Sequence, residues 1–188
     1  TVTGSGADAI GISITAEQAG AVLRGNTVKQ AASSGILVDG PRIEVRSNTV
    51  VQSGIGITTS GEGIVLRENL IGAETANGAV LGNTGHGVQV RSGSIDASRN
   101  VIAGSGGNGV DVASGATAKL TGNRIWASTG TAIANPDGPS APGIAGAIIA
   151  DTDGAPLTTL LIDGLEEGAT GTIEVFANDT ATGGQAQH

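Results

Sequence analysis

The sequence predicts an all-β chain whose larger part is a parallel β-helix, with five or six coils of about 22 residues each. Two recurring motifs support this prediction: one contains an asparagine, and the other has a glycine before alternating apolar residues. The composition agrees with it. The 188 residues include 33 glycines but only one Trp and one Phe, so the core must consist of Ile, Val, Leu and Ala. Such a core suits a thin, regular structure.

The asparagine motif reads AVLRGNTV at its first occurrence, and its asparagines are spaced by 22, 21, 31 and 23 residues. In coils stacked about 4.8 Å apart, equivalent side chains lie in one column. Buried amides in such a column bond to one another and to the turn backbone. We therefore expect an asparagine ladder, made of Asn26, Asn48, Asn69, Asn100 and Asn123.

The glycine motif adds another strand to each coil, reading GISI, GILV, GIGI, GVQV and GVDV along the chain. Period-two alternation turns Ile36 and Val38 of one copy to the same side. In the asparagine motif, Ile43 and Val45 point inward, and Val50 begins a third strand. Each coil is therefore expected to hold three short strands, with Gly and Asn at the turns because both tolerate positive φ.

The interval between Asn69 and Asn100 is about nine residues longer than the others, which predicts an excursion over residues 72–84. Insertions in solenoids map to surface loops, and these either are tolerated excursions or carry function. A processed or excised segment of a longer protein is expected, because the chain starts without Met and shows no signal peptide.

Three regions are predicted along the chain. Residues 1–134 form the β-helix, and residues 135–143 are a linker rich in Pro and Gly. Residues 144–188 contain apolar runs at 145–150, 156–165 and 170–178 that predict antiparallel strands. These strands are either a cap on the last coil or a truncated β-sandwich module.

NLIGAETANGAVLGNTGHGVQV (69–90), NVIAGSGGNGVDV (100–112) and TIEVFAND (172–179) resemble the right-handed parallel β-helix repeat family. The resemblance is closest to bacterial secreted or surface proteins that pair such a helix with a small β-sandwich-like module. It covers residues 9–134 and 144–178, and it implies a right-handed coil and an extracellular or cell-surface location. It implies no single activity, because helices of this kind serve in lyases, hydrolases, epimerases and adhesins.

Charge and composition exclude several other functions. A net charge of −8 argues against nucleic acid and against an anionic membrane surface. The chain lacks an apolar run long enough to cross a bilayer. Without Cys it can form neither disulfides nor zinc thiolates. The aspartates of DTDG (151–154) lack a glutamate at the spacing of a calcium loop, so no metal or cofactor is expected.

Arg24, Arg46 and Arg67 each lie two residues before a ladder asparagine. Stacking brings their guanidinium groups to about 5 Å from one another, where like charges repel unless an anion lies between them. Glu44 and Glu68 can supply that charge from within the chain. An acidic polysaccharide can supply it from outside, because Arg binds carboxylates in a bidentate manner.

A second group of polar residues flanks the excursion. His86 and Asn108 precede equivalent glycines, and Gln89 and Asp111 follow them, so both pairs should stack. Arg91 follows closely, and we expect Asp39 at the matching place two coils away. Arg91 could neutralise a uronate while His86 or Asp111 takes its proton. Alternatively, these are separate solvent-facing side chains. Lyases and hydrolases of the β-helix fold carry sites with several carboxylates, and the sequence shows no such concentration of Asp and Glu on one face.

The sequence thus favours a structural or binding segment of a secreted or cell-surface protein, with an acidic polysaccharide or another surface protein as its partner. The alternative function is that of a polysaccharide lyase or epimerase acting on a uronic-acid glycan, with His86, Arg91 and Asp111 as catalytic residues. The candidate binding residues are Arg24, Arg46, Arg67, Gln89 and Asn108. Association of copies through exposed strand edges or coil ends is a third expectation. Trp126 is expected to pack at the end of the helix rather than stack on a sugar.

Overall fold

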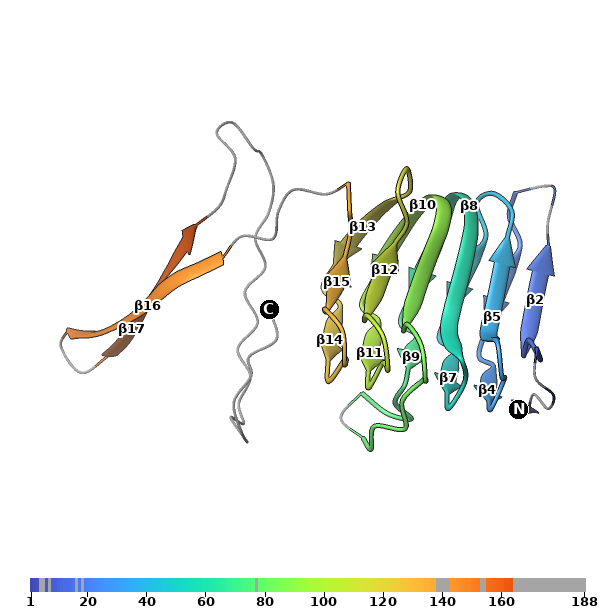
Figure 1. The fold of residues 1–188 in the computed structure, drawn as a ribbon, viewed down its shortest axis with the longest axis horizontal. Helices are drawn as coiled ribbons and strands as arrows, with labels where there is room; N and C mark the ends of the chain where they lie inside the picture. The colour runs from blue at the N-terminus through green and yellow to red at the C-terminus, as the bar shows by residue number, and fades with distance from the viewer. Residues whose placement is uncertain are drawn as a thin grey trace. The chain divides into compact units, whose positions relative to one another are not determined.

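The computed structural model describes residues 1–3, 6, 8–15, 17, 19–76 and 78–137 in full, and the backbone of residues 143–152 and 155–163. The chain divides into two units at Pro136. The first is a β-solenoid of about six turns whose coils run parallel, as the sequence predicted (Figure 1). No helix occurs among these residues, and so none that could cross a bilayer.

One face of the solenoid is a six-stranded parallel sheet with one strand from each coil. In spatial order its strands are β1 (Val2–Thr3), β4 (Thr27–Lys29), β7 (Thr49–Val51), β9 (Leu70–Ile71), β11 (Val101–Ala103) and β14 (Arg124–Trp126). The order follows the chain because each coil lies directly on the one before it.

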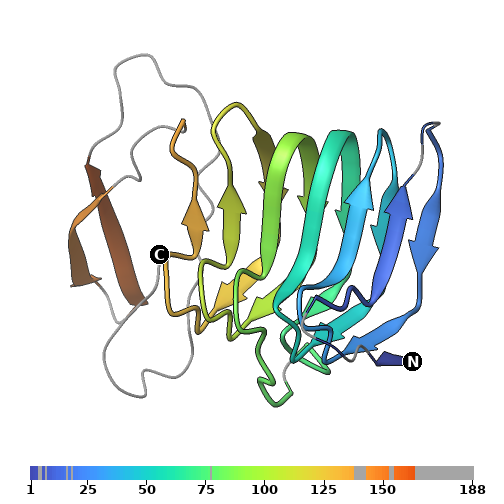
Figure 2. The ribbon, with the colours of Figure 1, turned by 45° about the vertical axis from the view of Figure 1, so that its right-hand side comes forward.

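The other two faces belong to one continuous nine-stranded sheet (Figure 2). Its first face holds β2 (Ile12–Thr15), β5 (Ser34–Asp39), β12 (Val110–Val112) and β15 (Ile133–Ala134), and its second holds β3 (Val22–Arg24), β6 (Glu44–Arg46) and β13 (Thr117–Thr121). The long strands β8 (Ile55–Arg67) and β10 (Val88–Ser98) bend and run through both faces. In these two coils, the first two expected strands are therefore one bent strand.

Apolar side chains of the same kind stack from coil to coil. Ile36 pairs in register with Ile57, and Ile57 with Val88. All three are buried, as are their counterparts on the other faces of the middle coils. The equivalent residues of the first and last coils are only partly buried, because among the described residues a neighbouring coil covers them on one side only. Burial along the solenoid thus falls toward both ends.

The recurring glycine of the GILV-type motif is needed for space rather than for backbone conformation. A Cβ on Gly35 would lie 2.2 Å from Cγ1 of Val50, and one on Gly87 would lie 2.4 Å from Cγ2 of Ile102. Neither glycine has a positive φ. The expectation that these glycines serve as left-handed turn residues was therefore wrong: they let the first face approach the six-stranded sheet.

Left-handed conformation occurs instead at the residue before each ladder asparagine. The residues there have φ between 52° and 67°, and they are Gly25, Ser47, Glu68, Arg99 and Gly122. A second left-handed column runs along the next turn, at Gln30, Gln52, Gly82, Gly104 and Ala127. The left-handed turn conformation recurs even where the residue is not Gly. The shape of the coil requires this conformation, and its steric cost for a residue with a Cβ is modest.

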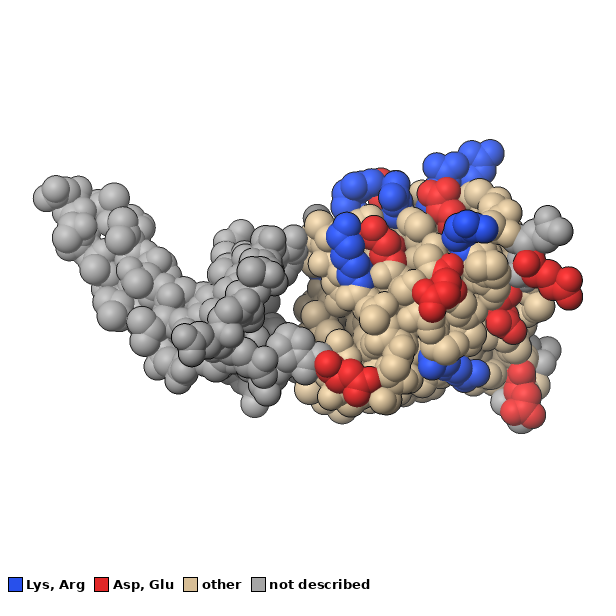
Figure 3. All heavy atoms as spheres, turned by 90° about the horizontal axis from the view of Figure 1, so that it is seen from above, with Lys and Arg blue, Asp and Glu red and all other residues tan. Residues whose placement is uncertain are grey.

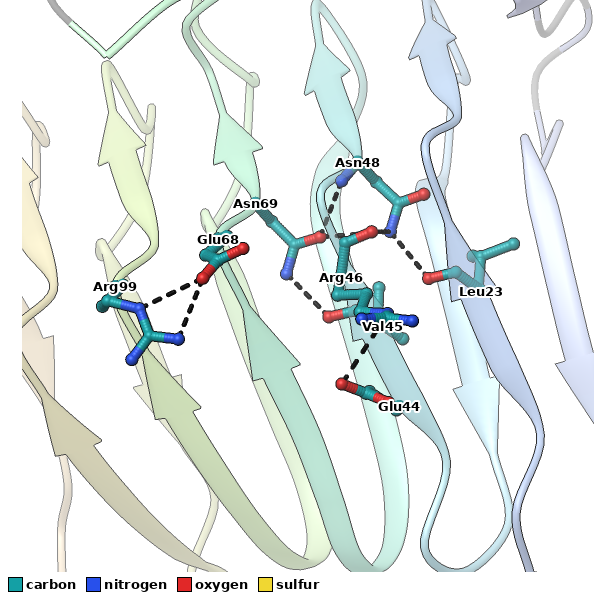
Figure 4. A network of polar contacts seen from close by, with 8 residues as sticks. All are labelled: Leu23, Glu44, Val45, Arg46, Asn48, Glu68, Asn69 and Arg99. Carbon is teal, nitrogen blue, oxygen red and sulfur yellow. Dashed lines mark hydrogen bonds and ion pairs between the residues drawn. The ribbon is translucent and has the colours of Figure 1, made fainter.

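The asparagine ladder is present and is buried from Asn48 to Asn123. Oδ1 of Asn69 accepts hydrogen bonds from the backbone N and from Nδ2 of Asn48, at 3.0 and 3.1 Å (Figure 4). Nδ2 of Asn69 donates to the carbonyl oxygen of Val45 at 2.9 Å. Each buried asparagine of the ladder therefore accepts the backbone N–H of the asparagine one coil before it, and its Nδ2 donates to a carbonyl of that preceding coil, as expected.

The second unit contains a β-hairpin formed by β16 (Gly143–Thr152) and β17 (Ala155–Asp163), which pair antiparallel. Two of the three apolar runs that predicted antiparallel strands coincide with these strands. The third run, at 170–178, and the remainder of the chain lie outside the described residues.

Candidate functional site

The arginine column forms on the second face of the solenoid as the repeat predicted. Arg24 pairs in register with Arg46, and Arg46 with Arg67, so parallel neighbouring strands carry the three guanidinium groups. Arg24 and Arg67 are exposed, and Arg46 is partly buried. The column continues through Ser98 and Thr121, which are uncharged. Its positive charge is therefore confined to the first half of the solenoid.

Internal carboxylates neutralise this column less than the sequence suggested. Glu44 approaches only Arg46, with 3.9 Å between Oε1 and Nε. Glu68 was expected to serve Arg67, but its Oε1 instead lies 2.9 and 3.2 Å from two nitrogens of Arg99 (Figure 4). The physical reason is placement: Glu68 and Arg99 share the left-handed turn column one coil apart, whereas Arg67 stands on the strand face.

Arg24 and Arg67 have no carboxylate within 4 Å among the residues that the structure describes. The column thus presents three positive charges and one loosely held negative charge. On the face seen in Figure 3, basic and acidic side chains are interspersed. The chain as a whole carries a net charge of −8.

The second group of sequence-predicted residues also comes together, on the first face. Gln89 pairs in register with Asp111. His86 lies beside Asn108, whose backbone N donates to Nδ1 of His86 at 3.0 Å. Arg91 donates from Nε to Oε1 of Gln89 at 3.1 Å. The structure therefore unites His86, Gln89, Arg91, Asn108 and Asp111 as neighbours.

Asp111 contacts both members of the neighbouring stack, His86 and Asn108. Its Oδ1 accepts a hydrogen bond from Nδ2 of Asn108 at 2.8 Å, and its Oδ2 lies 3.8 Å from Nε2 of His86. Asn108 in turn accepts bonds at Oδ1 from the backbone N and the hydroxyl of Thr131, at 3.1 and 3.2 Å. His86, Asn108 and Thr131 thus form a short polar ladder along successive coils.

The hydrogen bond at Nδ1 determines what His86 can do. Because this nitrogen accepts the N–H of Asn108, its lone pair is occupied and the ring proton lies on Nε2, facing Asp111. The neutral ring therefore has no free lone pair with which to take a proton from a substrate. A metal at Nε2 is disfavoured as well, since both ring nitrogens would then need lone pairs.

Asp39 does not match Arg91 as expected. Asp39 pairs with Ser60, and Ser60 with Ser92, while the register shifts between Val90 and Ser92. Arg91 is the extra residue at that shift. The described residues also contain no group of three or more His, Asp or Glu side chains arranged to hold a metal ion.

The extra residues after Asn69 leave the coil after Gly72 and rejoin it at Gly82, whose backbone N donates to the carbonyl of Gly72 at 3.0 Å. This loop folds over the outer side of the six-stranded sheet. Glu74 forms an ion pair of 2.5 Å with Lys29, and the carbonyl of Ala76 accepts a bond of 3.0 Å from Arg124. The loop is therefore tied to strands on both sides of its own coil.

A small apolar cluster accompanies the loop and accounts for Trp126. Ala73, Val101 and Ala103 are buried on the outer side of the sheet, and Leu70 and Trp126 pack against them. The guanidinium carbon of Arg124 lies 5.1 Å from the centroid of the Trp126 ring. Trp126 thus packs within the solenoid's last coils, in line with its expected structural role.

Sequence reasoning missed a second polar column at the turn after the six-stranded sheet. Ser53 donates from its backbone N to Oδ1 of Asn83 at 2.9 Å, and its hydroxyl accepts the N–H of Ala31 at 3.3 Å. Ser105 continues this column beyond Asn83. The sequence signal for this column was a set of small polar residues spaced about 22 residues apart. It was hard to recognise because the residue type changes from coil to coil and because one interval is lengthened by the loop.

Comparison of the chain with protein-family models, curated proteins and solved structures found no match.

Proposed function

We propose that this chain is a structural scaffold segment that binds an acidic polysaccharide along its arginine column, Arg24, Arg46 and Arg67. One observation carries the proposal: the three arginines stand in register on neighbouring parallel strands, and among the described residues only Arg46 has a carboxylate within 4 Å. A linear polyanion laid along the solenoid axis would meet one guanidinium at about every 4.8 Å. Guanidinium groups favour carboxylate and sulfate partners because their donors are planar and paired.

The scaffold supplies rigidity to this surface. The backbone of Arg46 is held by its strand pairing on both sides and by Asn48, whose Nδ2 donates to the carbonyl of Arg46 at 3.0 Å. The spacing of the charges is therefore fixed before a ligand arrives, which reduces the ordering cost of binding. An extracellular or cell-surface location in a bacterium follows as part of the proposal, supported by the sequence resemblance and by the class of ligand.

The enzymatic alternative, a lyase or epimerase using His86, Arg91 and Asp111, has weaker support. The three residues lie near one another, but Nδ1 of His86 is occupied by a backbone amide and Asp111 is held by Asn108 and His86. The neutral His86 ring therefore has no free lone pair for proton abstraction, and the Asp111 carboxylate is oriented toward Asn108 and His86. The cluster is better suited to hydrogen bonding than to proton transfer.

Binding to immobilised polygalacturonate tests the proposal. The measurement belongs at about 0.15 M salt, where the Debye length of about 8 Å screens the distant negative charges but not direct contacts. The double variant Arg24→Gln/Arg67→Gln should weaken binding about ten-fold, because two exposed ion pairs contribute roughly 0.2–1 kcal/mol each.

A matched control removes the same charge elsewhere. Arg42→Gln/Arg91→Gln changes two exposed cations outside the column and should bind polygalacturonate like the unmodified chain. Equal losses in both double variants would show a general charge effect and contradict the proposal. Release of unsaturated products, lost on Asp111→Ala, would instead support the lyase alternative.

A further inference from the structure

We infer that residues 73–81 are a built-in cover for an apolar strip on the outer side of the six-stranded sheet. The inference goes beyond the proposed glycan binding, since the arginine column plays no part in it. The spacing of 31 between Asn69 and Asn100 exceeds the ordinary spacing of 22 by nine, which is the length of residues 73–81. We call this segment, of which the structure describes residues 73–76 and 78–81, the cover. The coil has its ordinary length without it.

The two ends of the cover are held side by side. The backbone N–H groups of Leu81 and Gly82 both donate to the carbonyl oxygen of Gly72, at 2.9 and 3.0 Å from nitrogen to oxygen. Ala73 and Val80 form an antiparallel bridge just inside these bonds. Gly72 and Gly82 are thus near enough to be joined directly, so the coil can close where the cover now leaves it.

The strands beneath the cover carry apolar residues on their outer side. Residues on this side alternate with Val50, Ile71 and Ile102, which belong to the core. On β4, which precedes these strands, the outward residues are Thr27 and Lys29. From β7 to β14, five outward residues are apolar, and we call them the apolar strip: Val51, Leu70, Val101, Ala103 and Trp126. Val51, Val101 and Ala103 are at most 6% exposed, which requires that other residues lie over them.

Apolar contacts place the cover on this strip. Ala73, the first residue of the cover, is fully buried. It forms one cluster with Val101 and Ala103, and the other members of this cluster are Leu70 and Trp126, which pack against these three. The cluster is separate from the main core, because the six-stranded sheet lies between the two. The cover therefore supplies part of a second, smaller core.

Polar contacts extend the cover across the strip in both directions. Glu74 forms an ion pair of 2.5 Å with Lys29. Because Val51 pairs in register with Lys29 and stands between Lys29 and the coil of the cover, this ion pair passes over Val51. On the other side, Nη1 of Arg124 donates to the carbonyl oxygen of Ala76 at 3.0 Å. Glu74 and Ala76 are themselves exposed, so the cover separates the strip from water.

The coil after the cover has a glycine where the cover approaches it. A Cβ on Gly104 would lie 2.2 Å from Cγ1 of Val80, so a side chain there would lift Val80 and the cover from the sheet. Gly25 is left-handed as well, with φ of 67° against 62° at Gly104, but a Cβ on Gly25 would meet nothing within 4 Å. The two glycines therefore separate displacement of the cover from backbone strain.

Deletion of residues 73–81, which joins Gly72 to Gly82, is the first test. The deletion variant should keep the far-ultraviolet circular dichroism spectrum of the unmodified chain, because the shortened coil has the ordinary length. It should bind more of the dye ANS, which fluoresces on exposed apolar surface. The emission of the single Trp126 should shift to the red and be quenched more strongly by acrylamide, because Ala73 no longer completes its cluster.

Gly104→Ala tests the inference in a chain of full length, and Gly25→Ala is its matched control for left-handed strain. Gly104→Ala should raise both ANS fluorescence and the acrylamide quenching of Trp126, whereas Gly25→Ala should leave both unchanged. Unchanged dye binding and quenching in the deletion variant would overturn the inference and make the segment a tolerated excursion. Loss of the circular dichroism spectrum on deletion, or equal effects of the two glycine variants, would overturn it as well.

Discussion

Replacing Asn69 by Ala should destabilise the solenoid by about 4 kcal/mol. The Asn69 side chain is fully buried and makes four hydrogen bonds, two accepted from Asn48 and one donated to each of Val45 and Asn100. A buried hydrogen bond contributes about 1 kcal/mol net, and more is lost when a partner is left unsatisfied. The variant leaves the backbone N–H of Asn48 and the carbonyl of Val45 without these partners, so the sum of four bonds is the expected loss.

Equilibrium unfolding in urea measures this loss, followed by circular dichroism and by the fluorescence of the single Trp126. Coincident curves from the two signals justify a two-state free energy. Asn26→Ala is the matched control at the end of the same ladder. Its Oδ1 accepts nothing among the described residues and one of its two donated bonds is exposed, so it should cost only about 1 kcal/mol. Equal losses for Asn69→Ala and Asn26→Ala would refute the view that the interior of the ladder is a main source of stability.

Three further substitutions test the packing and the turns, each by the change in the free energy of unfolding. Ile57→Ala should cost about 3 kcal/mol because Ile57 is fully buried, whereas Ile133→Ala, at a side chain 50% exposed, should cost far less. Gly35→Ala should destabilise the solenoid more than Gly25→Ala. A Cβ at residue 35 would lie 2.2 Å from a methyl carbon of Val50, whereas a Cβ at residue 25 would meet nothing within 4 Å. A larger loss for Gly25→Ala would contradict the conclusion that the glycine motif is needed for space. Ala127→Gly should stabilise by about 0.5 kcal/mol because it relieves a left-handed residue with φ of 55°, and a loss of stability would show that this turn carries no such strain.

The repeat period by itself predicted much of the architecture. Once about 22 residues make one coil, the sequence places like residues above one another, which is why the asparagine ladder, the apolar columns and the arginine column could be read in advance. The stacking of His86 on Asn108 and of Gln89 on Asp111 followed from the same alignment. A solenoid is predictable in this way because its contacts join residues at a nearly constant separation along the chain.

Other features could be recognised only in the three-dimensional structure. The sequence places Glu68 next to Arg67, but the turn directs its carboxylate to Arg99 in the next coil. It places Asp39 opposite Arg91, but a register shift displaces Arg91 by one residue. The two errors have different causes: adjacency in the chain does not state in which direction the Glu68 side chain leaves the backbone, and an aligned repeat does not reveal an extra residue within a strand.

The sequence alone determined the coil, its columns and the residues that share a face, because the repeat encodes register. Only the tertiary structure decided which partner each polar atom takes and how the loop folds. It shows that the backbone N–H of Asn108 donates to Nδ1 of His86, that the loop lies over the outer side of the six-stranded sheet, and that each ladder asparagine donates to the next one along the chain. These depend on side-chain torsions and turn geometry, and a one-dimensional period carries no information about either.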